Sequence, residues 1–346
     1  MYSFRNDYSE GAHPSILEAM AATNLEGNFG YGCDPHCENA AALIRKKIAR
    51  PDADVHFFVG GTQTNTTVIA AVLRPWQGVL CAVSGHINCH EAGAIESTGH
   101  KVITLPTTNG KITAQQVQEY VEWHRNDEST EHIVQPGMVY ISYPTEGGTL
   151  YSKAELTELY NVCRRYGLPL FIDGARLGYG VMADGADLTL PEIAHLCDVF
   201  YIGGTKIGAL FGEAVVIMNP ALKKDFRFIM KQRGGRMAKG RLLGIQFDAL
   251  FTDDLYFRIS RHADEMAYQI RDIFVSAGYP LLFDSPTNQQ YPIMPDEELA
   301  ILGKNFGYEY WERTDPTHSG VRFCASWATT QENVDALRAA VQALKK

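Results

Sequence analysis

FYIGGTKIGAL, residues 200–210, predicts a buried strand that ends just before a lysine. Apolar residues run as far as Ile202, two glycines follow, and small and apolar residues come after Lys206. Burial disfavours the charged form of a lysine. Lys206 is therefore either a solvated residue whose aliphatic stem covers apolar neighbours, or a lysine in a partly dry pocket that loses its proton and becomes a nucleophile.

Strand-like and helix-like segments alternate around this stretch, from about residue 55 to 220. Several strand candidates are nearly continuous apolar runs, as expected for strands that are buried on both faces. Ser152 with Glu155, and Thr113 with Gln116, have the capping-box spacing of a helix start. The alternation predicts an α/β fold in which helices cover both faces of a mostly parallel sheet. The predicted strands are residues 55–60, 78–85, 101–106, 138–144, 168–173, 198–204 and 213–218.

The C-terminal part of the chain has a different pattern. Residues 253–278 predict one long helix, short strands are expected at 288–294, 308–314 and 320–327, and a last helix starts near Thr329 with Glu332 as its cap. We therefore expect two domains: residues 1–245, an N-terminal arm with a large cofactor-binding domain, and residues 246–346, a smaller α+β domain. The first thirty or so residues are rich in Gly, Asn and polar groups, so they are expected to form an arm outside the core.

Composition excludes several classes of function. The 346-residue chain has 45% apolar and 21% charged residues, and its net charge of −9 comes without a long basic run. This balance argues against nucleic-acid and anionic-membrane partners. The start of the chain has no signal-peptide pattern, and no apolar stretch has membrane-spanning length. The seven cysteines are scattered and include no C-x-x-C pair, as in reduced proteins, so we expect a cytoplasmic protein.

Ligands of α/β sheets bind at the carboxyl ends of strands, so the polar residues that follow the predicted strands are candidates for a site. Gly60 and Gly61 end one strand, and Thr62 is placed to cap the next helix. Glycines allow close backbone approach, and a helix N-terminus offers free N–H groups, so this segment is a candidate phosphate cradle. The alternative is a plain strand–turn–helix, since neither G-x-G-x-x-G nor G-K-[ST] is present.

His86 follows another predicted strand. His86 and His90 are four residues apart and Glu91 is adjacent, so a metal pair is one interpretation. The order is not H-E-x-x-H and no third ligand with a recognisable spacing follows, so no metal is expected. A histidine ring that lies over a flat cofactor is the better functional use, and a hydrogen-bonded loop histidine is the alternative.

Asp173 and Lys206 end two further predicted strands. A carboxylate at the end of the apolar strand is costly unless a cation pairs with it, and Arg176 is a candidate partner. The pair can instead face a ligand, with Asp173 on a protonated ring nitrogen and Arg176 on a carboxylate. One predicted helix separates Asp173 from Lys206, so both should lie at the same sheet edge, on neighbouring or near-neighbouring strands.

Pyridoxal phosphate requires all of these groups together. Its aldehyde forms a Schiff base with a lysine, its pyridinium nitrogen takes an aspartate partner, its phosphate takes backbone N–H groups, and its ring takes a flat neighbour. The combination is more specific than any single motif. It predicts pyridoxal 5'-phosphate as the cofactor and Lys206 as the residue that holds it.

The chain resembles the threonine aldolase family of the β-eliminating lyase group, which are fold-type I pyridoxal-phosphate enzymes. The resemblance is carried in order by FRNDYSEGAHPSILEAM, YGCDP, GGTQTN, SGH with EAGA, DGARL, TK-x-G and GVRFCASWATTQENVDAL. It implies phosphate contacts from Gly60, Gly61 and Thr62, a stacking role for His86, a ring-nitrogen contact from Asp173 and the Schiff base at Lys206. It also implies substrate contacts from Asn6, Arg176 and Arg322, with Arg176 close to the cofactor as well.

Three departures from the common family pattern favour the phenylserine-aldolase-like branch. SYPTEGGTL places Glu146 where many members have a histidine, and YGCDP places Cys33 where an acidic residue is common. RGGRMAKGRLLG replaces a glycine-rich segment, so Lys239 and Arg241, with Arg236, are candidates for a basic contact to the cofactor phosphate, either within one chain or across a subunit boundary.

The resemblance implies an aldolase that cleaves a β-hydroxy-α-amino acid such as L-threonine, L-allo-threonine or phenylserine to glycine and an aldehyde. His86, Glu146 or an ordered water is the candidate base. A homodimer or homotetramer with shared active sites is expected. The alternatives are β-elimination, transamination or racemisation on the same cofactor, and a small-molecule-binding α/β protein in which Lys206 and Asp173 merely pair.

Overall fold

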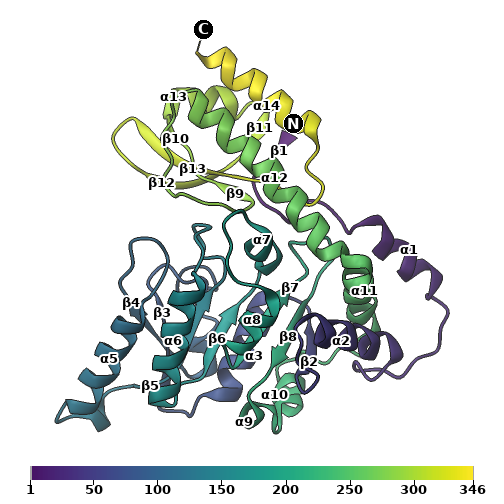
Figure 1. The fold of residues 1–346 in the computed structure, drawn as a ribbon, viewed down its shortest axis with the longest axis vertical. Coiled ribbons are helices and arrows are strands. Elements are labelled where there is room, and N and C mark those ends of the chain that lie inside the picture. Colours follow the sequence, from purple (N-terminus) through teal and green to yellow (C-terminus); the bar gives the residue numbers. More distant parts are fainter. Residues whose placement is uncertain (1, 346) are drawn as a thin grey trace.

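The computed structural model describes residues 2–345 and contains a seven-stranded sheet with the strand order β2-β8-β7-β6-β5-β3-β4 (Figure 1). The pairs from β4 through β3, β5 and β6 to β7 are parallel, whereas β8 is antiparallel to both β7 and β2. The predicted α/β fold with a mostly parallel sheet is confirmed. The strands are β2 (Asp54–Phe58), β3 (Gln77–Ala82), β4 (Lys101–Leu105), β5 (Gln135–Ser142), β6 (Leu170–Asp173), β7 (Val199–Gly203) and β8 (Glu213–Ile217).

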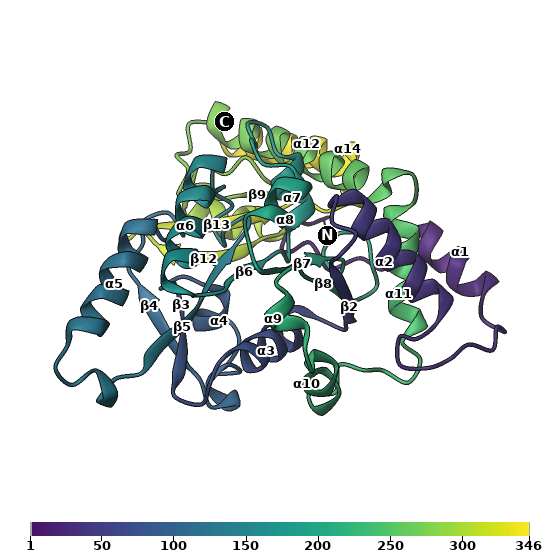
Figure 2. The same ribbon diagram turned by 60° about the horizontal axis from the view of Figure 1, so that its bottom comes forward.

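Helices cover both faces of this sheet because successive strand residues point to opposite sides. On β5, Val139 and Ile141 pack with α5, α6 and α8, whereas Met138 and Tyr140 pack with α3 and α10. Figure 2 shows these two groups of helices on opposite sides of the strands. The helices are α2 (Pro35–Lys47), α3 (Gly61–Val72), α4 (His86–Cys89), α5 (Ala114–Asn126), α6 (Lys153–Tyr166), α7 (Leu177–Met182), α8 (Leu190–His195), α9 (Pro220–Lys223), α10 (Phe226–Gln232) and α11 (Arg241–Phe251), with 3-10 turns at Glu96–Thr98, Thr130–His132 and Thr252–Asp254.

The small C-terminal part packs a four-stranded sheet against long helices. β13 pairs with β10, β12 and β9, all antiparallel. In Figure 1, α12 runs from the large sheet up to this small sheet. The elements are α12 (Leu255–Ser276), β9 (Gln289–Gln290), β10 (Ile293–Pro295), α13 (Asp296–Leu302), β11 (Phe306–Gly307), β12 (Glu309–Arg313), β13 (His318–Cys324) and α14 (Gln331–Leu344).

The expectation that the first thirty residues lie outside the core is wrong for two of its apolar side chains. β1 (Tyr2–Ser3) pairs with β11, which brings Phe4 into the small-domain core at 1% exposure. α1 (Pro14–Ala22) packs against α11 and buries Ile16 completely. The N-terminal segment therefore connects the two parts of the molecule. The division into residues 1–245 and 246–346 stays a proposal, and residue 245 itself lies within α11.

Two predicted helix caps are confirmed and two are wrong. Ser152 and Thr113 form capping boxes with Glu155 and Gln116. The last helix is capped by Thr330 with Asn333, because Glu332 lies inside its first turn. Gly60, not Thr62, is the N-cap of α3, so no side chain caps this helix. Among residues 2–345, no helix is both long and apolar enough to cross a bilayer.

Candidate active site

A cavity of about 340 Å³ lies at the carboxyl edge of the large sheet. Strand ends and the loops after them supply its walls, because parallel strands β3, β5, β6 and β7 all end at this edge. It brings together most of the residues that the sequence predicted, namely Gly60, Gly61, Thr62, His86, Glu146, Asp173, Arg176 and Lys206. Other residues that line it include Tyr8, Glu91, Ser142, Tyr201, Thr205 and Glu213.

Asp173, the last residue of β6, is buried at 4% exposure and its carboxylate is fully hydrogen-bonded. The hydroxyl of Tyr201 donates to Oδ1 at 2.5 Å, and that of Tyr140 donates to Oδ2 at 2.6 Å. Asn65 Nδ2 and the Ala175 amide add contacts at 3.1 and 3.0 Å. Burial alone would raise the pKa of Asp173, but His86 and these donors lower it below its usual value, so the group stays ionised.

Lys206 lies in the loop after β7, the neighbour of β6, so the predicted proximity to Asp173 is confirmed. Tyr179 fixes its backbone through a hydrogen bond to the Lys206 carbonyl at 2.5 Å. Its ammonium lies 6.0 Å from the centre of the Tyr8 ring. Burial, followed by the positive charge of Arg176, lowers the pKa of Lys206 below its usual value. The structure thus favours the second interpretation of the opening segment, a lysine in a partly dry pocket whose pKa is lowered.

The segment Gly60–Thr62 presents a helix N-terminus to the cavity. Gly60 has an extended backbone, and no side chain satisfies the first N–H groups of α3. A Cβ at Gly61 would lie 3.2 Å from the hydroxyl of Tyr201, so a side chain there would press on a donor to Asp173. Free N–H groups at a helix N-terminus are suited to an anion such as phosphate.

His86 is oriented by a buried carboxylate that the sequence analysis did not assign to the site. Its Nδ1 lies 2.8 Å from Oε1 of Glu91, which also accepts a hydrogen bond from Asn65 at 2.7 Å. A carboxylate is an acceptor, so it selects the tautomer in which Nδ1 carries the proton. The other ring nitrogen, Nε2, is left as an acceptor.

Glu146 is held in the cavity by main-chain and side-chain contacts. Its Oε1 accepts from Ser142 at 2.6 Å and from the His86 amide at 2.9 Å, while the Tyr291 hydroxyl donates to its carbonyl at 2.7 Å. Burial raises the pKa of Glu146 above its usual value despite these donors. The sequence left open whether burial would raise the pKa of Glu146 or nearby cations would lower it, and in the structure the effect of burial is larger.

Arg176 does not pair with Asp173. Its Nε and Nη2 donate to the two carboxylate oxygens of Asp7 at 2.7 and 3.0 Å, and Asn288 also donates to Asp7 at 2.9 Å. Burial opposes the charge, but Asp7 raises the pKa of Arg176 above its usual value. Among the described residues Nη1 has no hydrogen-bond partner, so it remains for a ligand in the cavity.

Four predicted site residues lie outside the lining of the cavity. Asn6 accepts hydrogen bonds from Tyr8 and Ser9, and Arg322 donates to Gln289 and to the Arg5 carbonyl. Lys239 is exposed. Arg241 donates to the carbonyls of Thr23 and Asn24, which follow α1. The roles of these four residues stay predictions, and a cofactor contact from Lys239 or Arg241 would require a second chain.

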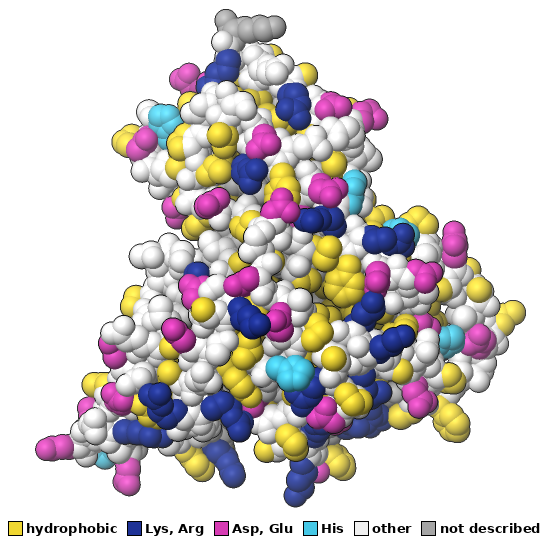
Figure 3. Space-filling model, viewed as in Figure 1, with side chains coloured by type: hydrophobic (Ala, Val, Ile, Leu, Met, Phe, Trp, Pro, Cys, Tyr) yellow, Lys and Arg dark blue, Asp and Glu magenta, His cyan; other side chains and the backbone are white. Residues whose placement is uncertain are grey.

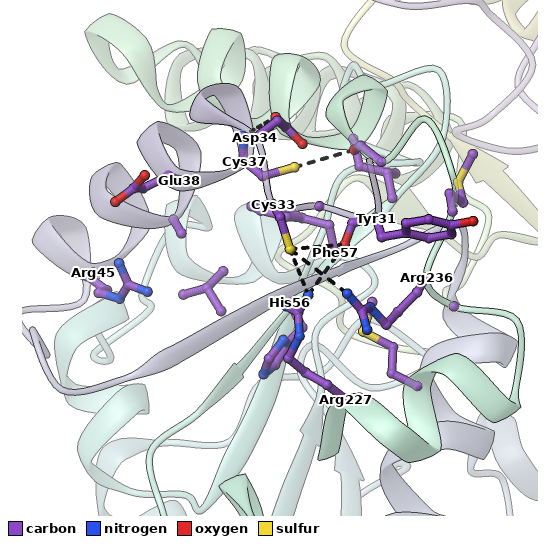
Figure 4. A pocket seen from close by; sticks show the side chains of 18 residues that line it. Tyr31, Cys33, Asp34, Cys37, Glu38, Arg45, His56, Phe57, Arg227 and Arg236 are labelled. Atoms are coloured by element: carbon purple, nitrogen blue, oxygen red, sulfur yellow. Dashed lines mark hydrogen bonds between the residues drawn. The ribbon is translucent and has the colours of Figure 1, made fainter. Parts of the chain in front are cut away.

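A second cavity of about 320 Å³ lies between α2, β2 and α10. Figure 4 shows Cys33 between the guanidinium groups of Arg227 and Arg236, whose Nη2 atoms lie 3.3 and 3.9 Å from its Sγ. Arg236 also lies near the ring of Tyr31, at 5.9 Å. Lys and Arg side chains gather at the bottom of the view in Figure 3, where Figure 1 places α10. This cavity contains neither a lysine nor a carboxylate from a strand end of the large sheet.

The residues of the first cavity fit pyridoxal phosphate. The open N-terminus of α3 suits its phosphate, the ionised Asp173 suits a protonated ring nitrogen, and Lys206 suits its aldehyde. His86 and Ala175 line the same space. No three His, Cys, Asp or Glu side chains within residues 2–345 gather closely enough to hold a metal ion.

Comparisons with known proteins identify the family. The model of the "Beta-eliminating lyase" family matches residues 3–339. A low-specificity L-threonine aldolase of Pseudomonas sp. is 30% identical over 99% of this chain and 97% of its own. A solved threonine aldolase structure from Leishmania major is 44% identical, covers all of both chains and superimposes with a TM-score of 0.97.

A more distant structure shares the fold alone. It is a probable N-succinyldiaminopimelate aminotransferase of Thermus thermophilus, 15% identical with a TM-score of 0.74, and it covers 100% of this chain and 94% of its own. The matches of family, sequence and structure extend over nearly the whole chain. This protein is therefore a fold-type I member of the β-eliminating lyase family and belongs to its threonine aldolase group.

Proposed function

We propose that this protein is a pyridoxal-phosphate-dependent aldolase that cleaves a β-hydroxy-α-amino acid to glycine and an aldehyde. The observation that carries the proposal is that one cavity holds Lys206, an ionised Asp173 and an uncapped helix N-terminus. L-threonine, L-allo-threonine and phenylserine are the proposed substrates. The threonine aldolase names of the Pseudomonas and Leishmania relatives support this reaction class.

When bound, pyridoxal phosphate supplies an aldehyde for the amino group and an electron sink for the bond that breaks. Lys206, whose pKa is lowered by burial and by the positive charge of Arg176, presents its amino group to that aldehyde. Asp173 keeps its negative charge and can hold a proton on the ring nitrogen. Arg176, anchored by Asp7, offers Nη1 to the substrate carboxylate and fixes the orientation of the amino acid.

Removal of the β-hydroxyl proton needs a base, and two side chains qualify. Glu146 has a raised pKa, which brings it closer to the pH at which a base works best. His86 has an oriented ring with Nε2 as an acceptor, but this ring is also the candidate that stacks on the cofactor. We propose Glu146 as the base, acting directly or through a water, because Ser142 and the His86 amide fix its carboxylate.

We further propose a cytoplasmic homodimer or homotetramer in which active sites are shared. Arg236 and Tyr31 lie in the second cavity, and Lys239 lies exposed on the adjoining loop. These groups have no role in the active site of their own chain, and the cofactor phosphate of a partner is a suitable ligand for the cations.

The direct test is to incubate the purified protein and pyridoxal phosphate with L-threonine, L-allo-threonine and phenylserine in parallel. Equal amounts of glycine and aldehyde are expected. Ammonia with a keto acid would instead indicate β-elimination, and product formation only with an added keto acid would indicate transamination. A protein that does not bind pyridoxal phosphate would be a binding module rather than this enzyme.

A further inference from the structure

Glu213 is a buried carboxylate in the active-site cavity with no assigned role. It is the first residue of β8 and is 4% exposed. Because β8 runs antiparallel to β7, its N-terminal end lies at the carboxyl edge of the parallel strands. Glu213 thereby lines the same cavity as Lys206.

The position of Glu213 is next to the phosphate cradle. Glu213 is paired with Phe58 across the β2–β8 ladder, and the chain continues from Phe58 through Val59 into Gly60 and Gly61. On its other side, the Gly204 amide donates to Glu213 Oε2 at 3.2 Å, and the Thr205 hydroxyl also hydrogen-bonds to the carboxylate. The carboxylate is therefore fixed to the loop after β7, in the cavity that Gly60 and Gly61 also line.

An ionised carboxylate would repel a phosphate at this position. A neutral carboxylic acid would instead donate its proton to a phosphate oxygen in a hydrogen bond to a charged acceptor. The surroundings decide which form is present. The titratable groups that face Glu213 are Lys206 in the loop after β7, Asp173 on β6, Tyr201 on β7 and Tyr256 on α12.

Apolar side chains also lie around the strand end that carries Glu213. β2 contributes Phe58, and α11 places Leu243 and Phe247 against the adjacent Gly212. Burial raises the pKa of Glu213 to about 8, although Thr205 and Lys206 act in the opposite direction. A bound phosphate would favour the neutral form further, because it adds negative charge nearby.

We propose that Glu213 binds the cofactor phosphate as a neutral carboxylic acid and that this hydrogen bond is lost when Glu213 ionises. The proposal rests on the proposed function, because it requires pyridoxal phosphate in this cavity. It adds a phosphate-binding residue and gives cofactor retention a pH dependence that is set by one side chain. The relevant proton stays on Glu213 and is shared with a phosphate oxygen, and no bond of the cofactor is broken.

The test is equilibrium binding of pyridoxal 5'-phosphate to the cofactor-depleted full-length protein between pH 7 and 9. Pyridoxal, which has the aldehyde but no phosphate, serves as a second probe. Wild type is compared with Glu213→Gln, which keeps the shape and neutrality of the side chain but does not titrate. Glu119→Gln, a change of the same kind on the exposed side of α5, is the matched control.

The proposal predicts that wild-type affinity for pyridoxal 5'-phosphate falls about tenfold more than that of Glu213→Gln over this range, because the neutral fraction of an acid with a pKa near 8 falls about tenfold. Glu119→Gln should follow wild type, and pyridoxal should show no such difference. Equal pH dependence in wild type and Glu213→Gln would overturn the proposal. A difference of the same size with pyridoxal would also overturn it, because Glu213 would then act on Lys206 rather than on phosphate.

The experiment distinguishes failure of the proposed function from failure of the proposed role of Glu213. If neither wild type nor the two variants bind pyridoxal 5'-phosphate at any pH, the proposed function fails and the role of Glu213 fails with it. If wild type binds the cofactor and cleaves substrate, but the pH dependence does not require Glu213, only the present inference is lost. Because wild-type binding of the two probes can be compared by itself, the test does not depend on the folding of the Glu213→Gln variant.

Discussion

The active-site cavity and the second cavity hold their charges in different ways. In the first, Asp173 accepts hydrogen bonds from two tyrosines, an amide side chain and the backbone. In the second, the guanidinium groups of Arg227 and Arg236 have a thiol and one backbone carbonyl as their hydrogen-bond partners among the described residues. The first cavity has a lysine, acids and the free backbone amides of a helix N-terminus, whereas the second has cations but no such lysine. The difference indicates that the first holds the lysine and the carboxylate that pyridoxal phosphate requires, and that the second is suited to hold an anion.

The largest effect should come from Lys206→Ala. Turnover should fall by at least about 10³-fold, the scale of a lost nucleophile, and the visible band of the bound cofactor should disappear. The fold should survive, because within residues 2–345 the Lys206 side chain makes no hydrogen bond and only its carbonyl accepts one, from Tyr179. Absorption spectra and circular dichroism of the purified variant would check both points. A coloured Lys206→Ala protein would mean that another lysine holds the cofactor.

Asp173→Asn should lower turnover by roughly 10²-fold or more, because an amide cannot keep the ring nitrogen protonated. Tyr140 and Tyr201 would also face a weaker acceptor, so some loss of melting temperature is expected. The comparison variant is Asp198→Asn, whose carboxylate is buried in hydrogen bonds with Leu170 and Asn219 away from the cavity. If both variants lose only stability and keep full turnover per folded molecule, Asp173 is a structural residue.

Glu146→Gln should keep the cofactor colour but slow cleavage by roughly 10²-fold, the scale of a lost general base. It should also change the pH dependence of stability. The pKa of Glu146 is raised in the folded state, so its contribution is fully present below its unfolded value and is lost as the pH rises through the folded value. Glu146→Gln should therefore melt at a higher temperature than wild type at pH 8, with little difference at pH 4. Near-normal kcat would leave His86 or a water as the base.

Arg236→Ala should have a smaller effect, a roughly tenfold loss of affinity for pyridoxal phosphate if its guanidinium reaches a partner's site. Arg165→Ala, on the exposed face of α6, is the matched control and should bind as wild type does. Mixed oligomers sharpen this test. Lys206→Ala and Arg236→Ala subunits should together form some sites that carry both wild-type residues. Light scattering that shows an active monomer would contradict shared sites.

Much of the fold and part of the site could be predicted from sequence. Continuous apolar strands followed by polar residues located Asp173 and Lys206, because strand ends have a local pattern. The donors to Asp173 were missed, although Tyr140 and Tyr201 occupy strand positions whose side chains point to the same face of the sheet. Their role depends on the order of β5, β6 and β7, which only the structure shows.

Other misses came from contacts between distant parts of the chain. Asp7 pairs with Arg176, which lies 169 residues later in the sequence, and no local pattern links them. The sequence indicated Glu91 only as a neighbour of a candidate metal pair, although its position shortly after His86 allowed a hydrogen bond. Glu213 follows a glycine at the start of an apolar strand, where a carboxylate is costly. The free-energy cost of a buried carboxylate at this position was the sequence signal that could have indicated Glu213 as a functional residue.

The most direct measurement is borohydride reduction of the protein with bound pyridoxal phosphate, followed by mass spectrometry of its peptides. Reduction converts the bond between cofactor and lysine into a stable amine, so the modified residue can be identified. The account predicts a pyridoxyl group on the peptide that contains Lys206, with none on the peptide that contains Lys239. Modification at a different lysine, or a reduced protein without any pyridoxyl group, would contradict the central claim that Lys206 holds the cofactor.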